Sequence, residues 1–471
     1  MSTTNPAVDG VDAVDAVDDA AAAAAAAVDE RLPLSRLLPL GLQHVLVMYA
    51  GAVAVPLIIG RAAKLSEAEI AILINSDLLA CGLATLLQSL GLWKFGIRLP
   101  VMMGISFATV SPMLAIMANP ELGLLGVLGA TIFAGAFGIL VAPFVGRLLP
   151  FFPSVVTGTI ITVIGITVMR VGIGWAAGGQ PTLPNGTPNP AYGDPLNLGI
   201  AFAVLAVILL VLKFGRGFLA NISILLGLVF GYVVCLGLGK VDLSALGQAS
   251  WLGVVAPMHF GMPKFDLLAC FTLSLIMLVV MVESLGMFLA LGSITGVELS
   301  RERITAGLRV DGMGTLLGGF LNTFMHTSFS QNVGLVAVTG VRSRWVCVVG
   351  GVILMSFGFL PKMAYTVASI PQYVLGGAGL VMFGMVAATG MRILASALLK
   401  SQANLYIAGI SISLGMIPLM ADKFFSKLPH ALEPLLHSGI LLATISAIVL
   451  NVMFNGVRYG YVEAREQAAA H

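Results

Sequence analysis

The chain has 471 residues, of which 58% are hydrophobic and 10% are charged, and its formal net charge is +2. An ordinary soluble domain carries about 25% charged residues, so this composition excludes a soluble enzyme. The 24 basic and 22 acidic residues form no dense basic cluster, which excludes a nucleic-acid partner. A polytopic membrane protein remains, with the lipid bilayer as its surroundings. Its 55 glycines suit the close helix contacts of such proteins.

The first thirty residues are acidic and contain an alanine tract, Ala20 to Ala27. A signal peptide needs a basic start and a longer apolar segment, so we expect a disordered or loosely helical tail over residues 1–34. The four cysteines stand singly, without the spacing of metal ligands or of a redox pair. We therefore expect neither a metal nor a cofactor.

Apolar segments follow one another along the rest of the chain, seven on each side of a polar stretch near residues 240–264. Several later segments are shorter than the roughly 20 residues that a simple span needs. The candidates are 37–60, 70–92, 99–117, 124–148, 155–173, 198–212, 222–238, 265–291, 305–324, 329–339, 345–359, 374–389, 403–419 and 432–454. The pattern predicts an all-α membrane protein with fourteen transmembrane segments.

The distribution of basic residues predicts the orientation. Fourteen spans put both termini on one side of the membrane, and that side then receives about two thirds of the 24 Lys and Arg residues. Positive charge favours the cytoplasmic face. We therefore expect a multi-pass protein of the plasma (inner) membrane with both termini in the cytoplasm.

The third and tenth segments are interrupted. The third begins after Pro100 and contains the run Gly104 to Phe107, and the tenth is only about eleven residues long. Each is third in its group of seven. Paired broken segments at matching positions indicate an inverted repeat whose substrate site lies near the middle of the bilayer. Freed backbone groups at such breaks are tolerated where they line a cavity.

Three acids lie in the interior of apolar segments, away from the first residues of each segment. Glu283 lies deep in the eighth segment, where an ionised carboxylate is expensive, so a ligand or proton carrier is favoured over a merely hydrogen-bonded acid. Asp77 is equally compatible with a polar helix contact. Asp311 follows Arg309 near one end of the ninth segment, and a solvated charge at the mouth is its alternative interpretation.

Four further residues could contribute to a site. Gln331 and Asn332 open the tenth segment, and a carboxamide can both donate to and accept from a nucleobase edge. Phe107 offers a ring and a backbone N–H at the other break. His44, in the first segment, either packs within the bundle or orients site residues. No metalloprotease, nucleophile-elbow or Walker signature occurs, so the sequence predicts no enzyme.

The run from Ser328 to Gly340 closely resembles the signature of the nucleobase–ascorbate transporter family, also called nucleobase:cation symporter 2. The signature requires Gln, Glu or Pro at its first position, then Asn, any residue, Gly, four residues, Thr and finally Arg, Lys or Gly; the run Gln331 to Gly340 matches throughout. The runs Gly41 to Val45 and Phe152 to Gly158 are similar to two further family motifs. The resemblance extends from about Leu37 to Phe454.

This resemblance implies a 7+7 inverted repeat divided into a core domain and a gate domain, typically as a homodimer. Glu283 and Gln331 would hydrogen-bond the base, and Phe107 would add ring packing and a backbone contact. His44, Asn332 and Ser106 would support the site, while Glu283 and Asp311 would serve proton coupling. The implied division is a tail at 1–34, core at 35–150 (helices 1–4), gate at 151–240 (5–7), an extracytoplasmic loop at 241–264, core at 265–370 (8–11), gate at 371–457 (12–14) and a tail at 458–471.

The resemblance also implies a substrate. Gln331 followed by Asn332 looks like the xanthine and uric acid branch, whereas uracil carriers tend to have glutamate at the first position. Met287 departs from several relatives, which carry Asp or His there, so coupling would depend on other groups. We expect proton-coupled uptake of xanthine or uric acid by alternating access. A uracil or ascorbate carrier, sodium coupling and a passive channel are the alternatives.

Overall fold

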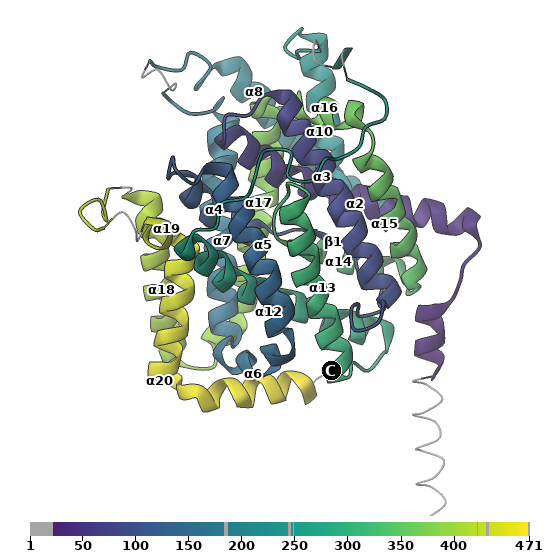
Figure 1. The fold of residues 1–471 in the computed structure, drawn as a ribbon, viewed down its shortest axis with the longest axis vertical. Coiled ribbons are helices and arrows are strands. Elements are labelled where there is room, and N and C mark those ends of the chain that lie inside the picture. The colour runs from purple at the N-terminus through teal and green to yellow at the C-terminus, as the bar shows by residue number, and fades with distance from the viewer. Residues whose placement is uncertain are drawn as a thin grey trace, which may run out of the picture.

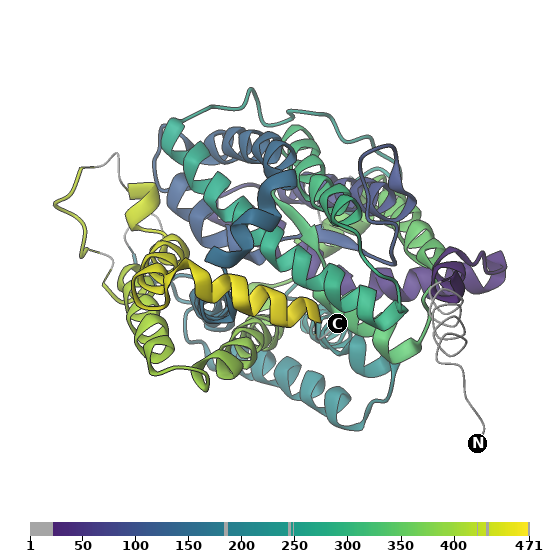
Figure 2. The ribbon, with the colours of Figure 1, turned by 90° about the horizontal axis from the view of Figure 1, so that it is seen from below.

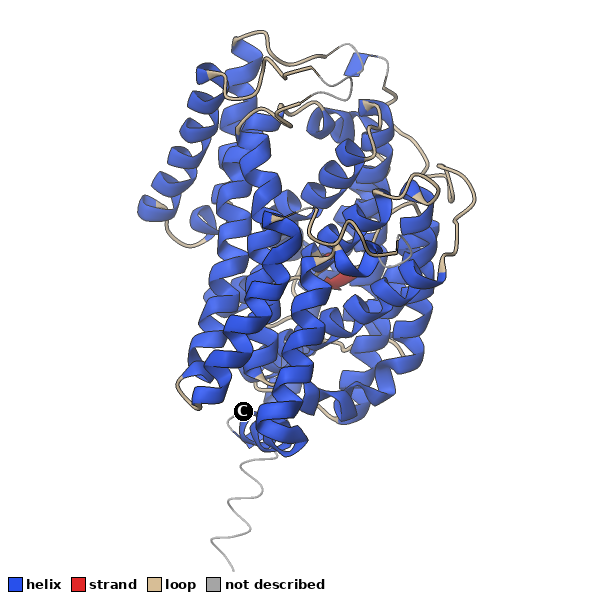
Figure 3. Ribbon diagram, turned by 90° about the vertical axis from the view of Figure 1, so that its left-hand side faces the viewer, coloured by secondary structure: helices blue, strands red, loops and turns tan. Residues whose placement is uncertain are grey.

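The structure is a computed structural model that describes residues 22–182, 187–243, 246–247, 249–421, 423–429 and 433–469. Most helices run along the long axis of the molecule and surround two short strands near its middle (Figures 1 and 3). The helical segment 22–29 and the end of the last helix lie at the same end of the bundle (Figures 1 and 2).

The first half of the chain contains two long helices, a broken segment and then further helices. Its elements are α2 (Leu34–Ala62), α3 (Glu67–Leu86), the π-helical turn η1 (Leu87–Gly91), β1 (Met103–Ile105), the 3-10 turn η2 (Phe107–Thr109), α4 (Val110–Met117), α5 (Gly123–Val141), η3 (Ala142–Phe144), α6 (Val145–Leu148), η4 (Leu149–Phe151), α7 (Ser154–Ala176), α8 (Pro195–Phe214), α9 (Phe218–Asn221) and α10 (Ser223–Gly237).

The second half repeats this order of a long helix followed by a broken segment. Its elements are α12 (Leu267–Thr295), α13 (Arg301–Phe320), β2 (His326–Ser328), α14 (Ser330–Thr339), α15 (Arg344–Gly358), α16 (Pro361–Ala368), α17 (Gln372–Leu398), α18 (Gln402–Met420), α19 (Glu433–Leu436) and α20 (Gly439–Ala469). Gly456 has a non-helical backbone inside α20 (φ 70°) and marks a kink there.

Local capping sets several helix boundaries. Ser66 and Glu69 form a reciprocal capping box at the start of α3, and Asp266 accepts the backbone N–H of Ala269 at the start of α12. Gly296 and Gly340 end α12 and α14 in the left-handed region, with φ of 75° and 67°. Glycine adopts that conformation without steric cost, so it terminates these helices cleanly.

The helical membrane fold is confirmed, whereas the count of fourteen spans is not. In the described residues nine helices are long and apolar enough to cross a membrane, or ten if α15 and α16, bent by 80°, form one span. Each of the fourteen expected segments contains a helix, but α4, α10 and α14 are short. The sequence also missed α16, which lies between the expected segments 345–359 and 374–389.

Two expectations need correction. The fold is not purely α-helical, because one three-residue strand lies within the third segment and another directly precedes the tenth. The two strands can satisfy each other's backbone groups, which a membrane interior requires. The tail is also ordered in part: residues 22–29 are helical, and Val28 and Ala24 are buried against the bundle. Residues 1–21 lie outside the described residues.

Glycines allow the closest helix contacts, as the composition predicted. A Cβ at Gly165 of α7 would lie 2.2 Å from the backbone nitrogen of Ala387 on α17, and one at Gly376 of α17 would lie 2.1 Å from that of Ala176. The pair α5 and α13 is similar, since a Cβ at Gly135 would lie 2.3 Å from Leu316 N. Backbones approach this closely only where side chains are absent.

Candidate functional site

The two interrupted segments meet at the centre of the molecule. Strands β1 and β2 pair antiparallel, with Met103 opposite Ser328 and Ile105 opposite His326. The backbone N–H of Ser106 donates to Met325 O at 2.9 Å, which extends this pairing by a further bond. Gly104 is needed here, because a Cβ at this position would lie 2.4 Å from the Phe329 ring. The pairing therefore brings two segments, distant in sequence, side by side.

A helix begins directly after each strand. The turn η2 and then α4 follow β1, with the Ser106 hydroxyl accepting the N–H of Ala108 at 3.3 Å. Helix α14 follows β2, and its N-cap residue, Phe329, supplies no side-chain acceptor. The N–H groups in the first turn of a helix have no partner within the helix, so they can receive acceptor atoms of a ligand.

Helix α12 attaches to β2 through Ser284. Its hydroxyl lies 3.0 Å from that of Thr327 and accepts the Ser328 N–H at 3.2 Å. The neighbouring residue, Glu283, is half-buried, and α12 also packs against α14 and η2. Ser284 thus fixes the position of the Glu283 backbone relative to the strand pair.

The three residues expected to bind substrate lie on elements that pack around α12. Gln331 is exposed in the first turn of α14, and its Oε1 accepts the Ser330 hydroxyl at 3.3 Å. Phe107 is half-buried in η2 and packs edge-on against Phe383 of α17, with ring centroids 5.7 Å apart. A carboxyl group, a carboxamide and an aromatic ring are thereby available around the two helix starts.

His44 and Asn332 form a buried pair between α2 and α14. The Asn332 amide donates to the backbone oxygen of His44 at 2.9 Å and lies 3.1 Å from its Nδ1. Asn332 is 1% exposed, so this carboxamide holds the start of α14 against α2 and is not itself open to the surface. The carboxamide of the preceding residue, Gln331, remains exposed.

Asp311 and Met287 lie near the same helix. Asp311 of α13 is fully buried, so the alternative of a solvated charge at the mouth was wrong. Its helix packs against α12, which contains Glu283 and Ser284. Neither of its carboxylate oxygens has a hydrogen-bond partner. Met287, one turn after Glu283, is half-buried and packs against the hydrophobic core.

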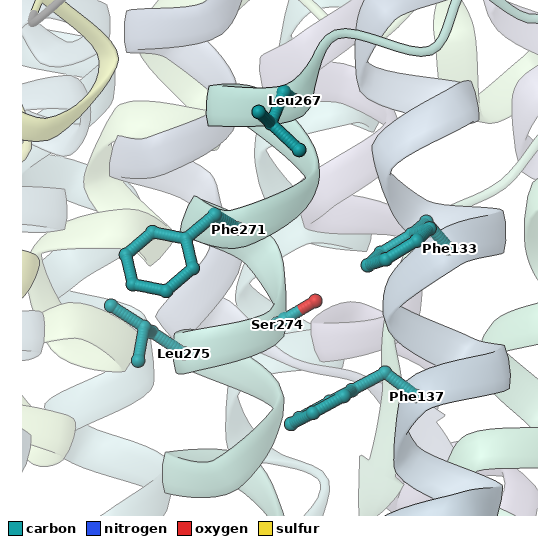
Figure 4. Close-up of a pocket in the computed structure, with 6 residues that line it drawn as sticks. All are labelled: Phe133, Phe137, Leu267, Phe271, Ser274 and Leu275. Atoms are coloured by element: carbon teal, nitrogen blue, oxygen red, sulfur yellow. The ribbon is translucent and has the colours of Figure 1, made fainter.

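A pocket of about 250 Å³ lies between α5 and α12, away from the strand pair (Figure 4). Phe133 and Phe271 line it and are 46% and 52% exposed, so it opens on the outer surface of the bundle. The hydroxyl of Ser274, the one polar side chain among its lining residues, donates within its own helix to Cys270 O at 2.7 Å. The pocket therefore has no free polar group that could select a nucleobase.

Sequence reasoning missed several polar residues around the strands. Ser284, Thr323 and Thr327 are small and common in membrane helices, so none was singled out. His326 had a usable signal, because it is one of only six histidines and stands in the polar run Asn322 to Ser328 of an otherwise apolar region. Phe383 of α17 carried no signal, since its contact with Phe107 depends on how two distant helices pack.

A protein-family model described as "Permease family" matches residues 35–424. The chain belongs to the nucleobase–ascorbate transporter family. The permease is 57% identical to the uric acid transporter UacT of Escherichia coli K12 over 92% of this chain and 89% of that protein. It is 42% identical to the xanthine permease of Bacillus subtilis 168 over 89% of this chain and 94% of that one.

Solved structures support the fold of this permease. The transmembrane domain of the cyanobacterial bicarbonate transporter BicA matches with a TM-score of 0.57, covering 89% of this chain and 97% of that one. The sequences are 15% identical, so the likeness concerns the fold alone. The family match and the similar transporters, together with the apolar helices, identify a multi-pass membrane transporter and not an enzyme.

Proposed function

We propose that the permease takes up xanthine or uric acid together with protons by alternating access. The observation that carries this proposal is the 57% identity, over 92% of the chain, to a uric acid transporter. The likeness to a xanthine permease supports the same substrate class. Both substrates are planar heterocycles with adjacent N–H and C=O groups.

The geometry around the strand pair suits such a base. The carboxamide of Gln331 can donate to a carbonyl and accept from a neighbouring N–H, and Glu283 can accept a second N–H. The first-turn N–H groups of α14 can receive a further oxygen. Phe107 can pack against the ring face, and its contact with Phe383 connects the segment after β1 to α17.

Proton coupling is assigned to the acids near α12. Glu283 and Asp311 lie on two helices that pack together, and two like charges in a nonpolar region disfavour simultaneous ionisation. Binding of one proton to this pair would relieve that repulsion. A transporter needs only that its two states differ in affinity for proton and base.

The proposed architecture follows the family. It is a 7+7 inverted repeat of fourteen segments, in which helices 1–4 and 8–11 form the core and helices 5–7 and 12–14 form the gate. Both termini would lie in the cytoplasm, and two chains would associate as a homodimer in the inner membrane. Short segments such as α4 and α14 would then span the bilayer together with the strands that precede them.

The test is uptake by the purified protein in proteoliposomes. The panel consists of xanthine, urate, guanine, uracil and ascorbate, with an imposed pH gradient and then a sodium gradient. We expect accumulation of xanthine or urate that the pH gradient drives. Accumulation driven by sodium alone would contradict proton coupling, uptake of uracil or ascorbate alone would contradict the substrate class, and equilibration without concentration would indicate a channel.

The variant Glu283→Gln tests the carboxyl group. It keeps the shape of the side chain but can neither ionise nor carry a proton, so we expect at least about a tenfold loss of pH-driven uptake, equivalent to about 1.4 kcal/mol. Surface expression and thermal stability serve as controls for folding. Undiminished, pH-coupled accumulation by this variant would eliminate the carboxylate role.

A further inference from the structure

A second buried polar cluster joins α3 to β2 and to the loop before it. The Thr323 hydroxyl donates to Asp77 Oδ1 at 2.8 Å, and the Cys81 thiol donates to Asp77 Oδ2 at 3.5 Å. His326 Nε2 lies 3.7 Å from Asp77 Oδ1. Asp77 and His326 are both 0% exposed, and none of these four residues is among those expected to bind substrate.

The imidazole of His326 is oriented by its other nitrogen. Nδ1 lies 2.9 Å from the backbone oxygen of Phe324, which can only accept, so Nδ1 carries a proton. A neutral ring then has a lone pair on Nε2, and this atom has no hydrogen-bond partner. It faces a carboxylate oxygen, and two lone pairs at that separation repel unless a proton lies between the groups.

The surrounding backbone holds the ring in this orientation. The N–H of His326 donates to the Thr315 hydroxyl of α13 at 3.1 Å. A Cβ at Gly318 would lie 3.2 Å from His326 Nδ1 and 2.6 Å from Phe324 O, so glycine at this position leaves room for both hydrogen-bonding atoms. The position of Nε2 opposite Asp77 is therefore determined by the fold.

We propose that Asp77 and His326 form a proton-binding site, separate from the substrate site, that holds β2 against α3 while it is protonated. The proton resides either on the carboxyl group or on Nε2, and in both arrangements the pair has no net charge. Loss of the proton leaves one negative charge in a fully buried position. Such a charge is costly without a partner, so deprotonation weakens the attachment of β2.

A metal ion is the competing occupant. The ligand atoms of Asp77, Cys81 and His326 lie within 4.8 Å of one another. However, both carboxylate oxygens already accept hydrogen bonds from Thr323 and Cys81, and a metal would have to displace these donors. Three protein ligands also fall short of the four that a structural zinc site uses. The hydrogen bonding therefore favours a proton.

Further ionisable groups lie on the elements packed against the pair, and several of them have partners of their own. Cys81 of α3 donates to Asp77, whereas the buried carboxyl group of Asp311, on the helix α13 that packs against both α3 and β2, has no hydrogen-bond partner. Several groups on α2, α15 and α16 do have partners: His44 contacts Asn332 and Cys347, Arg61 donates to Ile370 O, Arg344 donates to Ser89 O and Leu90 O, and Lys362 lies over the Trp251 ring. The buried Tyr49 hydroxyl of α2 has no hydrogen-bond partner. Asp77 and His326 are assigned the shared proton because their facing atoms, Oδ1 and Nε2, lie 3.7 Å apart.

The pair is connected to the substrate site by β2. His326 begins the strand, Thr327 contacts Ser284 at 3.0 Å, and Ser284 is adjacent to Glu283. Two residues after the strand, Ser330 begins α14. Release of β2 from α3 would therefore disturb both Glu283 and Gln331, and purine binding should weaken as pH rises through the titration of the pair.

The first test is a double-mutant cycle on thermal stability, which requires no substrate. His326→Gln leaves a buried carboxylate without its partner, and Asp77→Asn leaves the imidazole without its acceptor, so each should destabilise the protein. The double variant Asp77→Asn/His326→Gln is neutral and should be more stable than the sum of the two losses predicts. If the double variant lost as much stability as the two single variants together, Asp77 and His326 would not interact, and the proposed site would be overturned.

The second test rests on the proposed function and compares purine binding by wild type and double variant from mildly acidic to alkaline pH. A site that must bind one proton loses up to about tenfold in affinity per pH unit beyond its titration. Titration of the ligand affects both proteins equally. The difference between their pH profiles therefore measures how the proton of Asp77 and His326 contributes to purine affinity. We expect a steeper alkaline loss in wild type, and superimposable profiles would overturn the proposal.

Two controls separate the possible failures. If wild type binds no purine while the stability cycle shows coupling, the proposed function fails and the proton site stands. Elemental analysis of purified wild type addresses the metal. One equivalent of a transition metal that is lost in the double variant would assign the cluster to metal binding and overturn the proton site.

Discussion

The region around the strand pair and the contact between α7 and α17 are both closely packed, but different interactions hold them together. At the strands, hydroxyl groups from three helices accept backbone N–H groups of the extended segments: Thr85 of α3 accepts that of Met103, Ser284 of α12 that of Ser328, and Thr315 of α13 that of His326. Between α7 and α17, glycines bring two backbones together with few side-chain hydrogen bonds. The first region depends on particular donors and acceptors, whereas the second depends on the absence of side chains.

This difference agrees with the roles proposed for the two regions. Hydrogen bonds fix atoms in defined directions, which suits a site that must recognise a base and a proton. A smooth glycine contact tolerates small shifts but not added volume. Substitutions that remove a polar group should therefore harm the strand region, and substitutions that add volume should harm the contact of α7 and α17.

The largest effect is expected from Gly165→Val. The new Cβ would lie 2.2 Å from Ala387 N, which is backbone, so α7 and α17 must separate. Overpacking of this kind costs about 1–3 kcal/mol or more, and we expect a clear loss of thermal stability in detergent. Gly384→Val on α17 is the control, because a Cβ at Gly384 meets no atom within 4 Å. Coincident unfolding curves for the two variants would contradict the glycine contact.

The next effect is expected from Thr323→Val, which keeps the shape of the side chain but removes the donor to Asp77 at 2.8 Å. A buried hydrogen bond to a carboxylate contributes about 2 kcal/mol, so stability should fall by that order. In the control, Thr131→Val, the lost hydroxyl bonds only to Val127 O of its own helix, and little change is expected. An unchanged Thr323→Val protein would show that Asp77 does not depend on this donor.

Asn332→Ala should act mainly on transport. It removes both contacts with His44, at 2.9 and 3.1 Å, and so frees the start of α14. We expect uptake of xanthine or urate to fall about tenfold, equivalent to about 1.4 kcal/mol. The matched control is Asn455→Ala, which also removes a carboxamide. The Asn455 amide bonds to Asn404 of α18 and Asn451 of α20, not to a residue of α14. Equal uptake by the two variants would remove the supporting role of Asn332.

Ser284→Ala should have the smallest effect. It removes the hydroxyl that contacts Thr327 and accepts the Ser328 N–H, and a net loss of about 1 kcal/mol is expected. Ser274→Ala, one of the same residue type on the same helix, loses only a bond to Cys270 O and should remain near wild type. Comparable stability of these variants would mean that α12 is held to β2 by other contacts.

The sequence predicted different parts of the molecule with different success. The helices, the two interrupted segments and the family followed from hydropathy, from glycine and proline positions and from the run Gln331 to Gly340. The number of spans did not, because α4 and α14 are too short to be assigned by length alone. Asp77 was noticed as a buried acid, but its partner His326 was not.

What the sequence by itself determined is therefore local: apolar length, charge distribution and the residues of a signature are all read within one segment. Tertiary structure decided which segments meet. It paired β1 with β2, placed Phe107 against Phe383, and brought Thr323 to Asp77, 246 residues away. Such contacts depend on how distant helices pack around glycines, and a periodicity along the chain has no information about a partner that is near only in space.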